Sequence, residues 1–168
     1  SMRDNDKVNS ERISEPTRLR DGTRVLDIQN YVPFLLGATA NAWQRRTAAD
    51  YRARFGIGIV EWRILSMLNI EPDITANRIC DVIRMDKAAV SRTLTDLHKH
   101  EMLTFEASEN NSRKRKWRLS ENGLRKHNDV IVAALEHEGV MVEGLDSAEL
   151  EVFLKVIRKM LLNIDPKP

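Results

Sequence analysis

The residues from Arg113 to Arg118 read RKRKWR, so five of these six positions carry a cationic side chain. Lysine and arginine at this density can bind a polyanion by neutralising its phosphates and releasing counterions. A solvated surface loop is the alternative reading of such a run. The stretch 84–118 holds nine lysines and arginines against five acidic residues, a net charge of +4, so the rest of this chain of net charge +2 carries −2. Positive charge concentrated in one segment favours a polyanionic partner.

Residues that could catalyse a reaction or hold a metal ion show no recognisable arrangement. The sequence has no glycine-rich phosphate loop, HExxH pair or nucleophile elbow. His98 and His100 are two positions apart in a helical pattern, so their side chains point about 200° apart and are poorly placed to share a metal ion. We therefore predict no enzyme activity, no metal site and no cofactor, and place all four histidines on the surface. The other two are His127 and His137.

Length and composition set the class of protein. With 168 residues, 42% hydrophobic and 31% charged, the chain can form one globular domain with extensions. No apolar run approaches the roughly 20 residues of a membrane span, and the first residues lack the apolar core of a signal peptide. A single cysteine, Cys80, cannot form an intramolecular disulfide, which fits a reducing compartment. We predict a soluble cytoplasmic protein without a membrane partner.

The first part of the chain changes from polar to helical. Residues 1–20 have no apolar period and predict a flexible tail. A long helix is predicted to begin near Pro33, because proline is tolerated in a first turn, and to end at Gly56. Apolar residues at helical spacing predict a second helix over 59–70.

Two short helices follow with a tight connection. Thr75 can cap a third helix over 76–84, and Asp86 can cap a fourth over 87–102. Only a few residues separate them. This arrangement predicts a helix-turn-helix.

The pattern then changes from helix to strand. Residues 103–108 and 113–120 each read as a strand, separated by the turn-rich ENNS, so a β-hairpin is predicted. Alternation divides the side chains of the second strand between two faces. One face has Arg113, Arg115, Trp117 and Leu119, and the other has Lys114, Lys116 and Arg118. A basic hairpin after a helix-turn-helix predicts a wing that lies along phosphates or enters the minor groove.

The last third returns to helix. A helix is predicted from residue 121 towards Gly144, and Asp146 with Glu149 forms a capping-box start for another that ends before Pro166. Apolar residues recur along this final helix at the spacing of a broad stripe. They are Leu150, Phe153, Leu154, Ile157, Met160 and Leu161.

The helix over 87–102 has two different faces when its residues are placed about 100° apart. One face is apolar, with Val90, Leu94 and Leu97. The opposite face is small, hydroxylated and cationic, with Ala88, Arg92, Thr95 and Lys99, and Ser91 on its flank. Small residues allow close approach to a DNA groove, arginine can read guanine, and hydroxyls can bond phosphates or base edges. An ordinary amphipathic helix with a solvated face is the alternative.

The order of these elements resembles the MarR family of winged-helix transcriptional regulators over about residues 25–164. The motifs that carry the resemblance are FGIGIVEWRIL, MDKAAVSR and RLSENG. The resemblance implies a homodimer joined through the first and last helices, a pseudo-palindromic operator and, in many relatives, a small-molecule effector. It also matches the family's DNA contacts to named positions. In the recognition helix these are Lys87, Ala88, Ser91, Arg92 and Thr95, and at the wing tip Arg113.

Two positions depart from the family pattern. Asn111 stands where relatives usually have an aspartate that orients the wing arginine, and it lacks the charge of that aspartate. Lys114, Arg115 and Lys116 can compensate through less directed phosphate contacts. Arg84 stands in the turn where relatives often have glycine.

Some relatives sense oxidants through a thiol in the first helix. Cys80 is in the third predicted helix instead, which favours a buried, unreactive thiol over a redox sensor. Tyr31, Phe34 and Trp43 either line an effector pocket or make core and dimer contacts.

Together these readings predict a mainly α fold, a winged helix-turn-helix with a β-hairpin wing and an α-helical dimerisation region. The tail is assigned to 1–20, the dimerisation region to 21–56 and 121–168, and the DNA-binding domain to 57–120. The predicted function is a bacterial homodimeric regulator of transcription, a repressor or an activator, on double-stranded DNA. Its DNA-binding residues are Lys87, Ala88, Ser91, Arg92, Thr95, Lys99, Arg113, Lys114 and Arg115. A winged-helix module that binds an acidic protein surface is the alternative.

Overall fold

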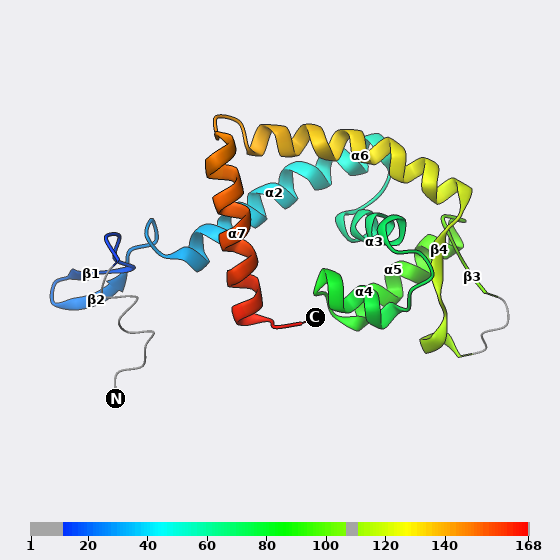
Figure 1. Cartoon of the computed structure of the whole chain (residues 1–168), viewed down its shortest axis with the longest axis horizontal. Helices are drawn as coiled ribbons and strands as arrows, with labels where there is room; N and C mark the ends of the chain where they lie inside the picture. The colour runs from blue at the N-terminus through cyan, green and yellow to red at the C-terminus, as the bar shows by residue number, and fades with distance from the viewer. Residues whose placement is uncertain (1–11, 107–110, 168) are drawn as a thin grey trace. The chain divides into compact units, whose positions relative to one another are not determined.

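The computed structural model describes residues 12–106 and 111–167 (Figure 1). Contacts divide the chain into two compact units, Ser1–Arg46 and Thr47–Pro168, and helix α2, Val32–Phe55, continues from the first into the second. No helix among the described residues has the length and apolar character needed to cross a membrane.

The first unit contains a β-hairpin that was not predicted from the sequence. Strand β1, Thr17–Arg20, pairs antiparallel with β2, Thr23–Leu26. Asp21 and Gly22 connect the strands with φ angles of 49° and 77°, and positive φ at both central residues is the pattern of a type I′ turn. The expectation of a tail without regular structure through residue 20 is therefore wrong for Thr17–Arg20, while residues 1–11 lie outside the described part. An Asp-Gly pair between two short strand-forming stretches was the available signal.

Helix α2 begins and ends where proline and glycine predict. Pro33 is its second residue, where the missing N–H costs no hydrogen bond within the helix. Gly56 follows the last residue in a left-handed conformation, with φ of 68°. Both predicted ends of this helix are confirmed.

The helix-turn-helix consists of α4, Ala76–Ile83, and α5, Lys87–Lys99, and packs on α3, Ile59–Ile70. The Thr75 side chain accepts a hydrogen bond from the Arg78 N–H at 3.3 Å, and Asp86 Oδ1 accepts from the Ala89 N–H at 2.8 Å. Both predicted N-caps are confirmed. Each helix ends before its predicted end, because Arg84 and Glu101 have left-handed φ angles of 53° and 61°.

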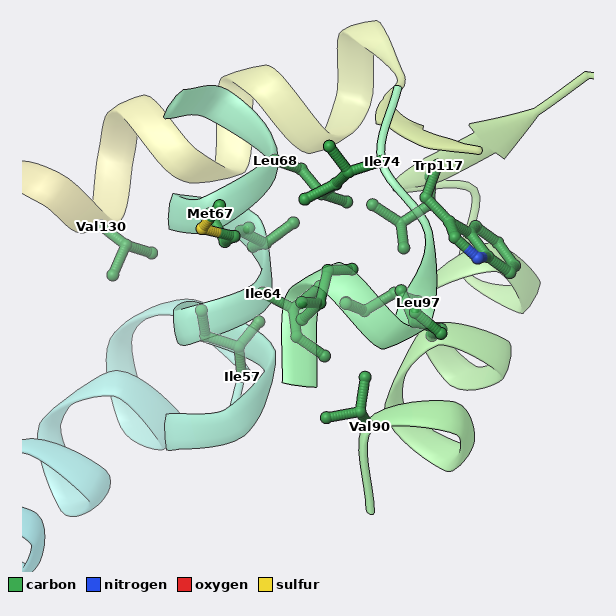
Figure 2. Packing of buried hydrophobic residues seen from close by; sticks show 14 of the residues in the cluster. Ile57, Ile64, Met67, Leu68, Ile74, Val90, Leu97, Trp117 and Val130 are labelled. Atoms are coloured by element: carbon green, nitrogen blue, oxygen red, sulfur yellow. The ribbon is translucent and has the colours of Figure 1, made fainter. Parts of the chain in front are cut away.

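The core of the second unit forms around α3 (Figure 2). Ile64 and Leu65 have no exposed surface, and they pack with buried residues of α4, α5 and the wing. The cluster also includes Leu68, Ile74, Ile79, Val90, Leu94, Leu97, Leu103, Trp117 and Val130. This burial fixes the recognition helix and the base of the wing to one scaffold.

The wing differs from its prediction. Strand β3, Leu103–Phe105, pairs antiparallel with β4, Trp117–Leu119, and Phe105 lies opposite Trp117. The second strand is shorter than the expected 113–120, because Ser112–Lys114 forms a short 3₁₀ helix, η1. Strand alternation therefore does not apply to Arg113 and Lys114. Residues 107–110, including the end of the first predicted strand, lie outside the described part.

Two long helices complete the second unit, α6, Glu121–Met141, and α7, Ser147–Ile164. The predicted capping box of α7 is confirmed, with hydrogen bonds of 2.8 and 3.0 Å between Asp146 and Glu149. No residue of α7 is buried, although its stripe is apolar, and Phe153 is 50% exposed. Burial of this stripe against a second subunit stays a prediction.

The expectation that all histidines lie on the surface is wrong for two of them. His127 is only 4% exposed, and its ring lies 5.3 Å from that of Trp62. His137 Nε2 lies 2.7 Å from Asp50 Oδ2. Both are on the inner face of α6, three and seven residues from the buried Val130, so helical spacing was the signal.

Candidate nucleic-acid interface

The two faces of α5 are as predicted. Val90, Leu94 and Leu97 are each at most 1% exposed, so they hold the helix on the core. The opposite side chains all face solvent, and they are Lys87, Ala88, Ser91, Arg92, Thr95 and Lys99. The helix therefore presents three cations, two hydroxyls and one methyl group on its open face.

The Asp86 cap stabilises the start of α5, and the positive charge at this end of the helix favours an anion. Asp86 satisfies the Ala89 N–H, and Lys87 is the first helical residue. Helix N-termini carry partial positive charge, which adds to that of the lysine. About two turns further on, the Thr95 hydroxyl donates to the Ser91 carbonyl oxygen at 3.0 Å, so the hydroxyl oxygen can still accept a hydrogen bond.

A cleft of about 320 Å³ separates the recognition helix from the wing. It brings together five of the residues predicted to bind DNA, which are Lys87, Ser91, Thr95, Arg113 and Arg115. Ala76, Asn77, Leu94 and Trp117 complete its lining. The other four predicted residues are Ala88, Arg92, Lys99 and Lys114, which are exposed but do not line the cleft.

Arg115 has a different environment from the other wing cations. It is half-buried, and its guanidinium carbon lies 4.3 Å from the centre of the Phe105 ring. Phe105 also contacts Trp117 and His98, with ring centres 5.0 Å away in each case. These four residues, which we call the aromatic cluster, connect the end of the recognition helix to the base of the wing.

Two buried N–H groups of the aromatic cluster lack a partner among the described residues. They are Nε of Arg115 and Nε1 of Trp117, and both residues line the cleft. A buried donor without an acceptor costs free energy. Both nitrogens have almost no exposed surface, so the charge of the cleft comes from the exposed parts of its cationic side chains and not from these two donors.

Arg113 and Arg118 show how the rest of the basic run is used. Arg113 is exposed, and its backbone N–H donates to Asn111 Oδ1 at 3.0 Å. Asn111 thus holds the backbone at η1, and among the described contacts it does not bind the Arg113 guanidinium. Arg118 forms an ion pair of 2.6 Å with Asp73, so the charge of this arginine is neutralised within the chain.

Cys80 lies on α4, and it does not line the cleft. The residue is half-buried, and burial raises the pKa of its thiol, with the nearby Asp81 carboxylate adding to the effect. A raised pKa lowers the thiolate fraction, which is the reactive form. The expectation of a buried thiol is met only in part, since Cys80 is half-buried, and its low reactivity stays a prediction.

Comparison with known proteins connects this geometry to a family. Residues 55–114 match the model of the MarR family, which covers α3, the helix-turn-helix and part of the wing. A crystal structure of a MarR/EmrR family transcriptional regulator from Acinetobacter sp. ADP1 has a TM-score of 0.77 and 27% identity, over 84% of this chain and 99% of that chain. The chain has the fold of these regulators, and its residues 55–114 match the MarR family model. The resemblance read from the sequence is confirmed.

Two other MarR-fold structures contain DNA. One is a putative MarR family transcriptional regulator from Listeria monocytogenes complexed with a 26mer DNA, at 17% identity, TM-score 0.70 and coverage of 78% of this chain and 87% of that one. The other is a complex of S. aureus MepR with DNA, at 18% identity, TM-score 0.69 and coverage of 79% and 95%. At these identities the likeness shows the MarR fold. No curated protein matches the chain significantly.

Proposed function

We propose that the chain is a homodimeric regulator of transcription that binds a pseudo-palindromic site on double-stranded DNA in the bacterial cytoplasm. The cleft between α5 and the wing is the observation that carries the proposal, because it joins exposed cations of both elements on one surface. Its residues suit a duplex, which presents base edges in the groove and phosphates on either side.

The recognition helix supplies the sequence-reading contacts in this proposal. Arg92 is exposed near the middle of α5 and can form paired hydrogen bonds with guanine in the major groove. Ala88 lets the helix backbone approach the groove, and Ser91 and Thr95 can bond base edges or phosphate. Lys87 and Lys99 lie near the two ends of the helix, where they can reach the phosphate backbone.

The wing and the start of α4 supply contacts with the DNA backbone. Arg113 and Lys114 are exposed and unconstrained by described ion pairs, so they can contact phosphates or enter the minor groove. Asn77, which was not predicted from the sequence to bind DNA, lies in the first turn of α4 and lines the same cleft. A phosphate oxygen in the cleft can accept a hydrogen bond from the side-chain amide of Asn77.

Exposed apolar side chains on α6 and α7 support the proposed dimer. Leu135 on α6 is 61% exposed, and Val152 and Phe153 on α7 are 59% and 50% exposed. Large apolar side chains that face water together mark surfaces that can bind a partner. Two subunits joined by such helices would place two recognition helices in successive major grooves, roughly 34 Å apart. Repression, and its relief by a small-molecule effector, are the regulatory mode that we propose from the family resemblance.

Selection of bound duplexes from random DNA by the purified protein tests this function. A pseudo-palindromic motif whose affinity falls steeply with salt is expected, since several phosphates are contacted. Sedimentation of the free protein tests the dimer separately. If no duplex is enriched at any salt concentration, the basic wing is better explained as a surface for an acidic protein.

A further inference from the structure

The end of α7 contacts the turn of the helix-turn-helix. Arg84, between α4 and α5, donates from Nη2 to the carbonyl oxygen of Asp165 at 3.3 Å. Its Nε lies 3.1 Å from Asp165 Oδ2, which makes an ion pair. The Nε–H of Arg84 is not aligned for a hydrogen bond with this oxygen. Beside it, Lys167 Nζ lies 3.7 Å from Asp81 Oδ1. Figure 1 shows the segment after α7 running towards α4, and we call Arg84, Asp165, Lys167 and Asp81 the C-terminal clamp.

Arg84 is placed between the C-terminal ends of two helices. Helix α4 ends at Ile83 and α7 at Ile164, and helix C-termini carry partial negative charge. The Arg84 guanidinium donates to the Val82 carbonyl oxygen at 3.4 Å as well as to that of Asp165, so one cation binds carbonyl oxygens at the C-terminal ends of both helices. Without it, two negative helix ends and the Asp165 carboxylate would face each other.

The backbone conformation of Arg84 indicates that its side chain makes stabilising interactions. Its φ and ψ are 53° and 48°, a left-handed conformation that favours glycine. The family resemblance also places glycine here, so the arginine accepts an unfavourable backbone conformation. The interactions with Asp165 offset that cost.

Burial makes this ion pair less screened than the others. The Arg84 and Asp165 side chains are 24% and 35% exposed, a lower combined exposure than in the pairs that Arg54, Arg78, Arg118 and Lys167 form with carboxylates. The pair of Lys167 and Asp81 is 42% and 57% exposed and is screened more strongly by salt.

The clamp has a large effect on geometry because α7 has little other support in the chain. None of its residues is fully buried, and none belongs to the hydrophobic core around α3 or packs against it, so that core does not fix the angle between α7 and the DNA-binding helices. We propose that Arg84 and Asp165 determine the half-site spacing that the dimer accepts, by fixing the helix-turn-helix to the end of a dimerisation helix. This role rests on the proposed function as a dimeric DNA-binding protein.

The test compares wild type with Arg84→Gly, which removes the side chain and suits the left-handed backbone. Binding is measured to the selected duplex and to duplexes whose half-sites are one or two base pairs closer or further apart. Wild type is expected to prefer one spacing. The variant should bind the altered spacings relatively better, so that the ratio between best and shifted affinities falls several-fold.

A charge exchange and a matched variant separate the clamp from general destabilisation. Arg84→Asp with Asp165→Arg restores an ion pair and should restore the spacing preference. Arg78→Ala breaks the pair of Arg78 and Glu71, which joins α4 to the end of α3 at 3.1 Å, and should leave the preference unchanged.

Each negative outcome has its own meaning. If Arg84→Gly binds with an unchanged spacing profile, the clamp does not determine spacing and the inference is overturned. Failure of wild type to bind any duplex would overturn the proposed function and the spacing role with it. Distances between spin labels at Lys155 and Asp96, in a Cys80→Ala background, check the clamp without DNA: a broader distribution in Arg84→Gly supports it, and an identical one overturns it.

Discussion

Gly123 lies directly against the backbone of Met102, so that a Cβ at Gly123 would overlap the Met102 carbonyl oxygen. The same carbonyl accepts a hydrogen bond from the Ser120 N–H at 3.0 Å, and Ser120 caps α6 by accepting from the Gly123 N–H. The junction between the wing and α6 therefore requires glycine because of space, since the φ of Gly123 is ordinary. This contact gives a physical reason for the RLSENG motif.

Gly123→Ala is expected to destabilise the protein by about 1–3 kcal/mol, because a backbone carbonyl cannot move aside as a flexible side chain can. The free energy of unfolding in urea measures the effect. Gly139→Ala is the matched control, since Gly139 is on the same helix with nothing near its Cβ position. The control should be neutral or stabilising by up to about 1 kcal/mol. Equal stabilities of the two variants would contradict the close contact.

Local chemistry made much of the fold predictable. Thr75, Asp86 and Asp146 cap helices through contacts three residues away, so the sequence alone indicated these helix starts. The wing was harder, because η1 depends on the Asn111 side chain holding the Arg113 N–H instead of on strand propensity. The hairpin at Asp21 and Gly22 was missed, although its turn signal was present.

The candidate site was predictable on α5 and less so elsewhere. Helical periodicity separated Arg92 from Leu94 correctly, because one helix determines both directions. The pairing of Arg118 with Asp73 and the place of Asn77 in the cleft join residues far apart in sequence. Such contacts depend on the tertiary fold, which periodicity does not reveal.

Arg92 and Lys114 are expected to contribute to DNA binding in different ways. Arg92→Ala should relax base preference at one position, at a cost of about 1–3 kcal/mol for the preferred site, because a base contact is lost. Lys114→Ala should weaken binding to all sequences and lower the salt slope by about one unit. Salt titrations on selected and scrambled duplexes measure both effects. If both variants changed base preference and salt slope in the same way, the assignment of Arg92 to base contacts and Lys114 to phosphate contacts would be contradicted.

The aromatic cluster predicts a wing contribution that does not depend on the number of cations. Phe105→Leu keeps an apolar side chain but removes the ring below the Arg115 guanidinium, so Arg115 loses its orientation. DNA affinity should fall several-fold while the salt slope stays the same, since no charge is removed. Arg115→Ala should lower both the DNA affinity and the salt slope. If Phe105→Leu binds DNA with unchanged affinity, the stacking of Arg115 on Phe105 does not position the wing.

Asp50 predicts an acid-dependent contribution to stability. The hydrogen bond from His137 lowers the pKa of the Asp50 carboxyl below its ordinary value of 3.8. A carboxyl group whose pKa is lowered in the folded state stabilises the fold at pH values above its unfolded-state pKa. This contribution is lost as the pH falls through the folded-state pKa. Asp50→Asn should therefore be less stable than wild type near pH 7, and the difference should shrink below about pH 4. Urea unfolding across this range measures it, with Asp129→Asn, exposed on α6, as the control.

The environment of Cys80 predicts that its thiol is alkylated slowly in the folded protein. Burial, and then the Asp81 carboxylate, raise the pKa of the thiol above its ordinary value of 9.0, so little thiolate is present near pH 8. Iodoacetamide should modify Cys80 more slowly in the native protein than in urea, as followed by mass spectrometry. Because the thiol lies outside the cleft, Cys80→Ser should bind DNA as wild type does, and peroxide should alter neither protein's affinity. Rapid native alkylation, with DNA affinity that peroxide abolishes only in wild type, would instead establish Cys80 as an oxidant sensor.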